Sequence, residues 1–215
     1  MPPLPPPPEF CLAHPRLPPP RCRPMRISGG AARGITLQTP KGDTTRPATD
    51  GMRQAVFSSL AARVPGARFV DLFAGSGGYG LEAFSRGAEA GVFVEKNNRA
   101  ARCIAQNIEA VARSVRREPA ALRLVTMDAL AWSPQPGEAP DLVFVDPPYG
   151  IIPETGPRLF ARMEADAWFA AGADPVVVFE MPGELELQPP GWTCVKRLGK
   201  GARQPTVCFF RKTRQ

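Results

Sequence analysis

The sequence contains almost no histidine: His14 is the single one among 215 residues, and it lies in a proline-rich stretch near the N-terminus. If that stretch is dispensable, the rest of the chain has no histidine base, no serine–histidine–aspartate triad and no histidine to ligate a metal. The five cysteines are scattered without a close pair, so neither a disulfide framework nor a zinc site is indicated. Many hydrolase chemistries are thereby excluded, and no metal is expected.

Long apolar runs are also absent. No segment approaches the roughly 18 apolar residues that a membrane-spanning helix needs, and the N-terminus lacks the continuous apolar core of a secretory signal. We therefore expect a cytoplasmic protein without a membrane partner. Proline, in contrast, is abundant, and 11 of the 27 prolines fall within residues 1–24, a composition that favours solvated polyproline II. The sequence predicts a disordered tail over residues 1–24, with globular sequence beginning at Met25.

The net charge of +7 is unevenly distributed along the chain. Residues 196–215 carry seven basic and no acidic side chains, and residues 25–53 carry five basic against two acidic ones. Residues 54–195 carry 12 basic and 17 acidic side chains. A mildly acidic centre with two basic ends favours contact with a polyanion such as a nucleic acid. Basic ends that serve solubility alone are the alternative.

Short apolar runs rich in β-branched and aromatic residues predict strands that are buried on both faces. These runs are residues 69–73, 91–94, 122–125, 142–145 and 175–179. Asn97 or Asn98 can cap a helix whose apolar positions lie on one face, namely Ala101, Ile104, Ile108 and Val111. Strands that alternate with helices predict a doubly wound parallel α/β sheet. Residues 193–198 and 206–210 are expected to add a final antiparallel pair.

Residues 25–65 predict an N-terminal appendage, ahead of a main domain that spans residues 66–215. A strand is expected over residues 33–37, and residues 44–50 are typical of a loop. Thr49 or Asp50 can cap the helix that follows, in which Val56, Phe57 and Leu60 have helical spacing.

A glycine-rich turn over residues 75–80 directly follows the first of the five apolar strands and precedes a helix. Its glycines let backbone amides approach a ligand at the carboxyl end of the strand, where open α/β sheets bind cofactors. The spacing of these glycines also fits the G-x-G-x-x-G pattern of dinucleotide binding, so the turn alone does not choose the cofactor.

Three acids lie at or near the carboxyl ends of successive predicted strands. Glu95 can hold the two hydroxyls of a ribose, and Asp128 can accept a hydrogen bond from an adenine amino group. Asp71 lies inside its strand, and a buried carboxylate needs a partner, which a cationic ligand such as the amino-acid end of S-adenosylmethionine provides. Together these acids predict one nucleoside pocket.

Asp146-Pro147-Pro148-Tyr149 follows the fourth strand and indicates chemistry on a base amino group. Such a nitrogen is a poor nucleophile because its lone pair is delocalised into the ring, so it must be oriented for attack on a methyl group. The Asp146 carboxylate and the Pro147 carbonyl can accept its two N–H groups, Pro148 helps to fix the backbone, and Tyr149 offers a face for base stacking. A proline turn without function is the alternative.

These motifs, with Gly80-Leu81-Glu82-Ala83 and Val94-Glu95-Lys96, resemble class I methyltransferases that act on base amino groups. Three segments near the N-terminus further resemble the bacterial family that methylates guanine N2 in small-subunit ribosomal RNA: residues 26–30, 33–34 and 46–50 with Arg53. The resemblance covers about residues 25–211. It implies a Rossmann-like α/β fold with a mostly parallel seven-stranded sheet, helices on both faces, and S-adenosylmethionine as the methyl donor. It also implies 16S rRNA, in an assembling or assembled small ribosomal subunit, as the partner.

The resemblance and the charge distribution together assign three groups of site residues. The donor-binding residues are Asp71, Phe73, Ala74, Gly75, Ser76, Gly77, Glu95, Asp128 and Ala129. The catalytic residues are Asp146, Pro147, Pro148 and Tyr149. The RNA-binding residues are Arg26, Arg33, Arg46, Thr49, Arg53, Lys200 and Arg203.

Three other functions stay open at this stage. A DNA amino-methyltransferase acting on adenine N6 or cytosine N4 uses the same aspartate–proline–proline–tyrosine motif, but it usually needs a recognition domain for which this chain has no room. An NAD-dependent oxidoreductase explains the glycine turn but leaves residues 146–149 without a role. A non-catalytic RNA-binding protein does not explain the intact acids of the pocket.

Overall fold

The structure is a computed structural model of the chain, and it describes residues 24–40, 50–199, 201 and 204–213. The predicted tail, apart from Pro24, and most of the predicted loop over residues 44–50 lie outside the described residues.

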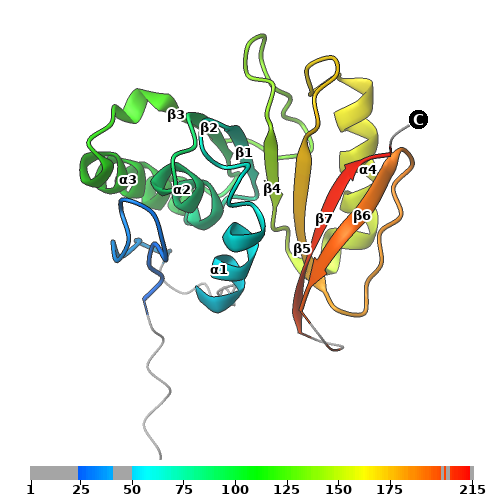
Figure 1. The fold of residues 1–215 in the computed structure, drawn as a ribbon, viewed down its shortest axis with the longest axis horizontal. Helices are drawn as coiled ribbons and strands as arrows, with labels where there is room; N and C mark the ends of the chain where they lie inside the picture. The colour runs from blue at the N-terminus through cyan, green and yellow to red at the C-terminus, as the bar shows by residue number, and fades with distance from the viewer. Residues whose placement is uncertain (1–23, 41–49, 200, 202–203, 214–215) are drawn as a thin grey trace, which may run out of the picture.

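A seven-stranded sheet with the strand order β3-β2-β1-β4-β5-β7-β6 forms the centre of the molecule (Figure 1). The strands β1 to β5 pair in parallel, and β7 pairs antiparallel with both β5 and β6. Their bounds are β1 Arg68–Leu72, β2 Ala90–Val94, β3 Leu122–Val125, β4 Leu142–Val145, β5 Val176–Pro182, β6 Trp192–Leu198 and β7 Pro205–Lys212. The Rossmann-like class I fold predicted from the sequence is confirmed, including its C-terminal antiparallel pair.

Within the described residues, four α-helices and two short 3-10 helices accompany the sheet. They are α1 Asp50–Ser59, α2 Gly78–Ser85, α3 Asn98–Val115, α4 Ile152–Ala165, η1 Pro119–Ala121 and η2 Tyr149–Ile151. The side chain of Asn97 caps α3 by accepting hydrogen bonds from the backbone N–H groups of Arg99 (2.8 Å) and Ala100 (3.2 Å). This confirms the predicted helix start.

Alternate residues of the strands divide the core into two layers, because successive side chains point to opposite faces of a sheet. Phe69, Phe93 and Phe144 pack with α1, α2 and α3 on one face. Val70 and Val143 pack with α4 on the other face. Residues of the predicted N-terminal appendage, namely Ile27, Leu37, Val56, Phe57 and Leu60, belong to the first layer. They therefore share one core with the sheet.

The prediction of a strand over residues 33–37 is wrong. Thr36 forms a single bridge to Arg26, and residues 31–34 form a turn. Gly30 and Gly34 adopt positive φ angles of 77° and 92°, which bend the chain and leave no room for a longer ladder.

Candidate active site

The turn between β1 and α2 holds the backbone in conformations that suit a ligand site. Phe73, Gly75 and Gly77 have φ angles of 57°, 57° and 80°, and Phe73 is a bulky residue in a region that such residues rarely adopt. A Cβ atom on Gly80 would lie 2.4 Å from the ring of Phe93 and 2.5 Å from that of Phe69. Only glycine lets α2 begin this close to the sheet, which fixes the turn over the carboxyl ends of β1 and β2.

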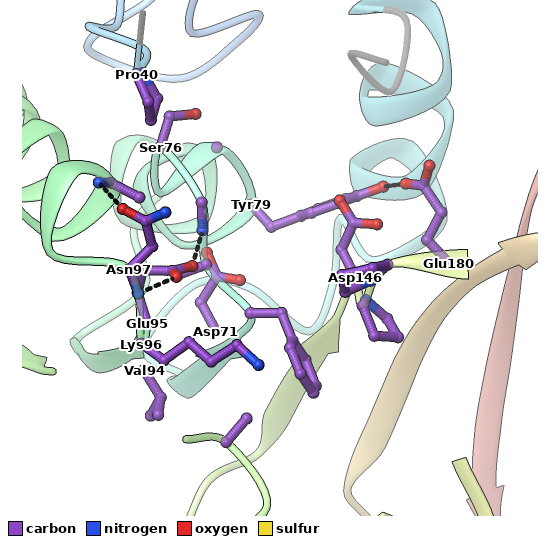
Figure 2. A pocket seen from close by; sticks show the side chains of 18 of the residues that line it. Pro40, Asp71, Ser76, Tyr79, Val94, Glu95, Lys96, Asn97, Asp146 and Glu180 are labelled. Carbon is purple, nitrogen blue, oxygen red and sulfur yellow. Dashed lines mark hydrogen bonds between the residues drawn. The ribbon is translucent and has the colours of Figure 1, made fainter. Parts of the chain in front are cut away.

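Glu95 lies immediately after β2 and is held by two backbone donors. The N–H of Gly75 donates to one carboxylate oxygen (2.8 Å), and the N–H of Asn97 donates to the other (2.7 Å) (Figure 2). Each oxygen keeps lone-pair capacity for a further donor. The Glu95 carboxylate is thus fixed at the cavity with acceptor capacity for a pair of hydroxyls.

Asp71 is almost fully buried, with 2% exposure, near the carboxyl end of β1. One oxygen accepts a hydrogen bond from the N–H of Gly80 (2.8 Å), and no residue that the structure describes donates to the other oxygen. Burial raises the pKa of Asp71 to about 8, the Gly80 hydrogen bond lowers it, and the charge of Glu95 raises it further. A buried carboxyl group with spare acceptor capacity is suited to a cationic ligand.

A cavity of about 690 Å³ connects this turn to the ends of β4 and β5. Its lining includes most of the predicted donor-binding residues: Asp71, Phe73, Ala74, Gly75, Ser76, Glu95 and Ala129. Gly77 is the N-cap residue of α2, and Asp128 lies outside the lining. Asp128 is exposed, accepts a hydrogen bond from the N–H of Leu130 (2.8 Å), and lies 3.9 Å from the ammonium of Lys96.

All four residues from Asp146 to Tyr149 line the same cavity. Asp146 follows β4 directly, and its carboxylate accepts no hydrogen bond from the part of the chain that the structure describes. Burial raises the pKa of Asp146 well above its ordinary value, and the negative charges of Glu180 and Asp71 raise it further. The structure therefore brings the predicted donor-binding and catalytic residues to one cavity.

Tyr79 and Glu180 line this cavity and were not assigned to the site by the sequence analysis. Tyr79, on the first turn of α2, donates a hydrogen bond from its hydroxyl to Glu180 on β5 (2.8 Å), as Figure 2 shows. The ring of Tyr79 stacks on that of Phe144, with centroids 5.5 Å apart. A glutamate inside an apolar strand is the sequence signal that could have identified Glu180, since a buried acid needs partners.

Comparisons with known proteins agree with this site. The family model described as conserved hypothetical protein 95 matches residues 25–210. Ribosomal RNA small subunit methyltransferase D of Escherichia coli strain K12 is 32% identical over 171 residues, which cover 79% of this chain and 81% of that protein. The chain therefore belongs to the ribosomal RNA small subunit methyltransferase D family. The methyltransferase D protein of Haemophilus influenzae is another member and is 27% identical over 179 residues, which cover 82% of this chain and 89% of that protein.

Solved structures show the same fold as this methyltransferase D family member. A structure from Escherichia coli superposes with a TM-score of 0.72 at 28% identity, and the match covers 90% of this chain and all of that chain. A hypothetical protein of Thermus thermophilus superposes with a TM-score of 0.64 at 31% identity, covering 86% of this chain and 97% of the other.

The structure places Arg53 differently from the RNA-binding role that the sequence analysis gave it. It was predicted to contact RNA, yet it is buried, with 1% exposure. Its guanidinium donates to the Arg26 carbonyl and to Asp50 (2.7 Å), and it lies 3.5 Å from Glu82. An RNA phosphate on the surface cannot reach a side chain held in this way. The prediction that Arg53 contacts an RNA phosphate at the surface is therefore wrong. The residue supports the wall of the cavity, which it lines.

The other predicted RNA-binding residues fall into two groups. Arg26 and Arg33 are exposed, so their side chains are available to a polyanion. Arg46, Thr49, Lys200 and Arg203 lie outside the described residues.

Neither a metal site nor a membrane span was found in the part of the chain that the structure describes. No group of three or more histidine, cysteine, aspartate or glutamate side chains there has an arrangement that could hold a metal ion. Among the described helices, none combines the length and apolar character needed to cross a bilayer.

Proposed function

We propose that the protein transfers a methyl group from S-adenosylmethionine to the exocyclic N2 amino group of a guanine in small-subunit (16S) ribosomal RNA. The observation that carries the proposal is the single cavity in which Asp71 and Glu95 lie at one end and Asp146 and Pro147 at the other. The family relation supports the coarser part of this proposal, namely methyl transfer to small-subunit ribosomal RNA. A cytoplasmic location and the small ribosomal subunit as partner belong to this proposal.

The residues present fit the donor. S-adenosylmethionine combines a nucleoside with a cationic amino acid, and the fixed carboxylate of Glu95 suits the ribose hydroxyls. Asp71 offers its free oxygen to the ammonium group, and the cavity of about 690 Å³ is within the usual size range for ligand sites. Bound there, the donor would supply a methyl group activated on a sulfonium.

Asp146 and the Pro147 backbone orient the acceptor nitrogen. The carboxylate and the carbonyl take its two N–H bonds, which turns the nitrogen lone pair toward the methyl group. The methyl group would leave the donor's sulfonium, which becomes a neutral thioether, as the nitrogen–carbon bond forms. The nitrogen, made more acidic by this bond, would then release a proton to Asp146. The raised pKa of Asp146 suits it to this step, because burial makes the ionised carboxylate a stronger base than an exposed aspartate.

The assay that tests the function uses radiolabelled donor with three acceptors: naked 16S rRNA, small ribosomal subunits and DNA. We expect label in RNA, released by nuclease digestion as N2-methylguanosine. Label in DNA adenine or cytosine, or in no acceptor, would contradict the proposal. The oxidoreductase alternative is tested in parallel by calorimetry, in which we expect the methyl donor to bind and NAD not to bind.

Donor affinity should rise with pH between about 5.5 and 7. The Asp71 pKa of about 8 means that this carboxyl group is mostly protonated there in the free protein. A bound ammonium favours the ionised form, so binding releases close to one proton and affinity rises by up to about tenfold per pH unit. Calorimetry in buffers with different ionisation enthalpies counts the protons released. Asp71→Asn should bind more weakly and without this pH slope, and a wild-type protein without the slope would refute the role of Asp71.

A further inference from the structure

Two carboxylates face the acceptor end of the cavity from neighbouring strands. Val145 of β4 pairs with Phe179 of β5, so Asp146 and Glu180 follow at the same level on adjacent parallel strands. Strands in a sheet lie about 4.8 Å apart. Both residues line the cavity, and Figure 2 shows their carboxylates near the hydroxyl of Tyr79. A base that enters this end meets two hydrogen-bond acceptors side by side.

The edges of the bases differ in how well they match two adjacent acceptors. Guanine presents N1–H beside its N2 amino group, so two neighbouring positions are donors. Adenine and cytosine present a ring nitrogen beside the amino group, and that nitrogen is an acceptor. An extruded base is recognised through this Watson–Crick edge. Two adjacent acceptors therefore match guanine, whereas with adenine or cytosine one of them would face another acceptor.

The carboxylate of Glu180 is buried and already accepts hydrogen bonds. It is 4% exposed, and the only two tyrosines of the chain, Tyr79 and Tyr149, both direct hydrogen bonds to its carboxylate. Burial is the largest effect and leaves the pKa of Glu180 above its ordinary value, although these hydrogen bonds and the charge of Arg53 lower it. Each donor that reaches the carboxylate favours its ionised, acceptor-only form. One more donor, such as a base N1–H, acts in the same direction.

We propose that Glu180 is the residue that selects guanine, by accepting the N1–H of the target base while Asp146 and Pro147 accept its N2 amino group. The proposal rests on the proposed function, since it assumes that a base amino group is the methyl acceptor. It adds a specificity residue on β5 to the motif that follows β4.

The test compares bases that keep the amino group at C2 but change N1. A synthetic RNA segment that carries guanine, 2-aminopurine or 2,6-diaminopurine at the nucleotide labelled by the wild-type protein is ligated into 16S rRNA and assembled into subunits. Both analogues present an acceptor at N1. With the wild-type protein we expect kcat/KM for either analogue to be at least about 100-fold lower than for guanine, because two acceptors then face each other without a proton.

Glu180→Gln provides the matched change in the protein. A glutamine amide can turn its NH2 group toward an acceptor, so the preference for guanine over 2,6-diaminopurine should fall by at least about tenfold. Glu109→Gln, an identical substitution on the exposed face of α3, should leave the preference unchanged. Donor binding and thermal melting of each variant are measured alongside.

The outcomes separate this proposal from the proposed function. Guanine and the analogues methylated equally by the wild-type protein would overturn the role of Glu180 and leave the methyltransferase function standing. A Glu180→Gln variant that loses the same factor on every base would show that Glu180 only supports the two tyrosines, and would also overturn it. If this variant does not fold, the wild-type comparison alone decides. No label in any C2 amino group would contradict the proposed function itself.

Discussion

Asp146→Ala should lower the rate of methyl transfer by about 1,000-fold and leave the affinity for S-adenosylmethionine within about threefold. The Asp146 carboxylate orients the reacting nitrogen and receives its proton, and both interactions strengthen toward the transition state. Loss of one such group typically costs about 100- to 1,000-fold in kcat. Asp71 and Glu95, which are assigned to the donor, keep their hydrogen bonds to the glycine turn in this variant.

Single-turnover kinetics and calorimetry of the donor measure the two quantities separately. Asp146→Asn should retain more activity than the alanine variant, since its amide oxygen still accepts one N–H but cannot take the proton. Glu109→Ala on the exposed face of α3 is the control and should keep full activity. An alanine variant with full turnover, or one that loses donor binding as strongly as turnover, would refute this role of Asp146.

Much of the sheet could be predicted because its strands are short apolar runs that are buried on both faces. All seven predicted strands of the main domain are present within two or three residues of their expected ends. The helix α4 was not predicted, and Pro153 and Pro157 explain why: a proline in the first turn is compatible with a helix, but from sequence alone the pair resembles a loop. The appendage strand failed because its glycines form a turn instead.

The residues of the candidate site could be predicted where they are adjacent in the sequence, but not where the pairing of two strands brings them together. Asp146 to Tyr149 is one segment with a recognisable chemistry, whereas Glu180 becomes its neighbour only through the pairing of β4 with β5. Tyr79 was visible only as a member of the glycine turn, and its hydrogen bond to Glu180 spans 101 residues of sequence. Arg53 was misinterpreted because a basic residue in a basic segment is usually exposed. Its buried carboxylate partner, Glu82, belongs to a different element.

Glu82→Gln should destabilise the fold by about 3 kcal/mol. Glu82 is fully buried on α2 and accepts hydrogen bonds from the Ser28 N–H (2.7 Å), the Ser28 hydroxyl (2.8 Å) and the Arg86 guanidinium (2.8 Å). It also neutralises the buried Arg53 at 3.5 Å. Removing one charge of a buried pair costs about 3–5 kcal/mol when the other is left uncompensated, and here the half-exposed Asp50 still pairs with Arg53 at 2.7 Å. The amide oxygen of glutamine can still accept a hydrogen bond from Ser28, so we expect a cost at the low end of this range.

Urea unfolding monitored by circular dichroism measures this free energy, and Glu154→Gln is the matched control. Glu154 pairs with Arg158 at 2.8 Å, but both side chains are more than half exposed, at 76% and 60%, so the same substitution should change stability by less than about 1 kcal/mol. Adding Arg53→Met to Glu82→Gln should cost much less than the sum of the two single changes, because the unpaired charge is then gone. Equal effects of Glu82→Gln and Glu154→Gln, or strictly additive costs in the double variant, would show that Glu82 and Arg53 do not act as a pair.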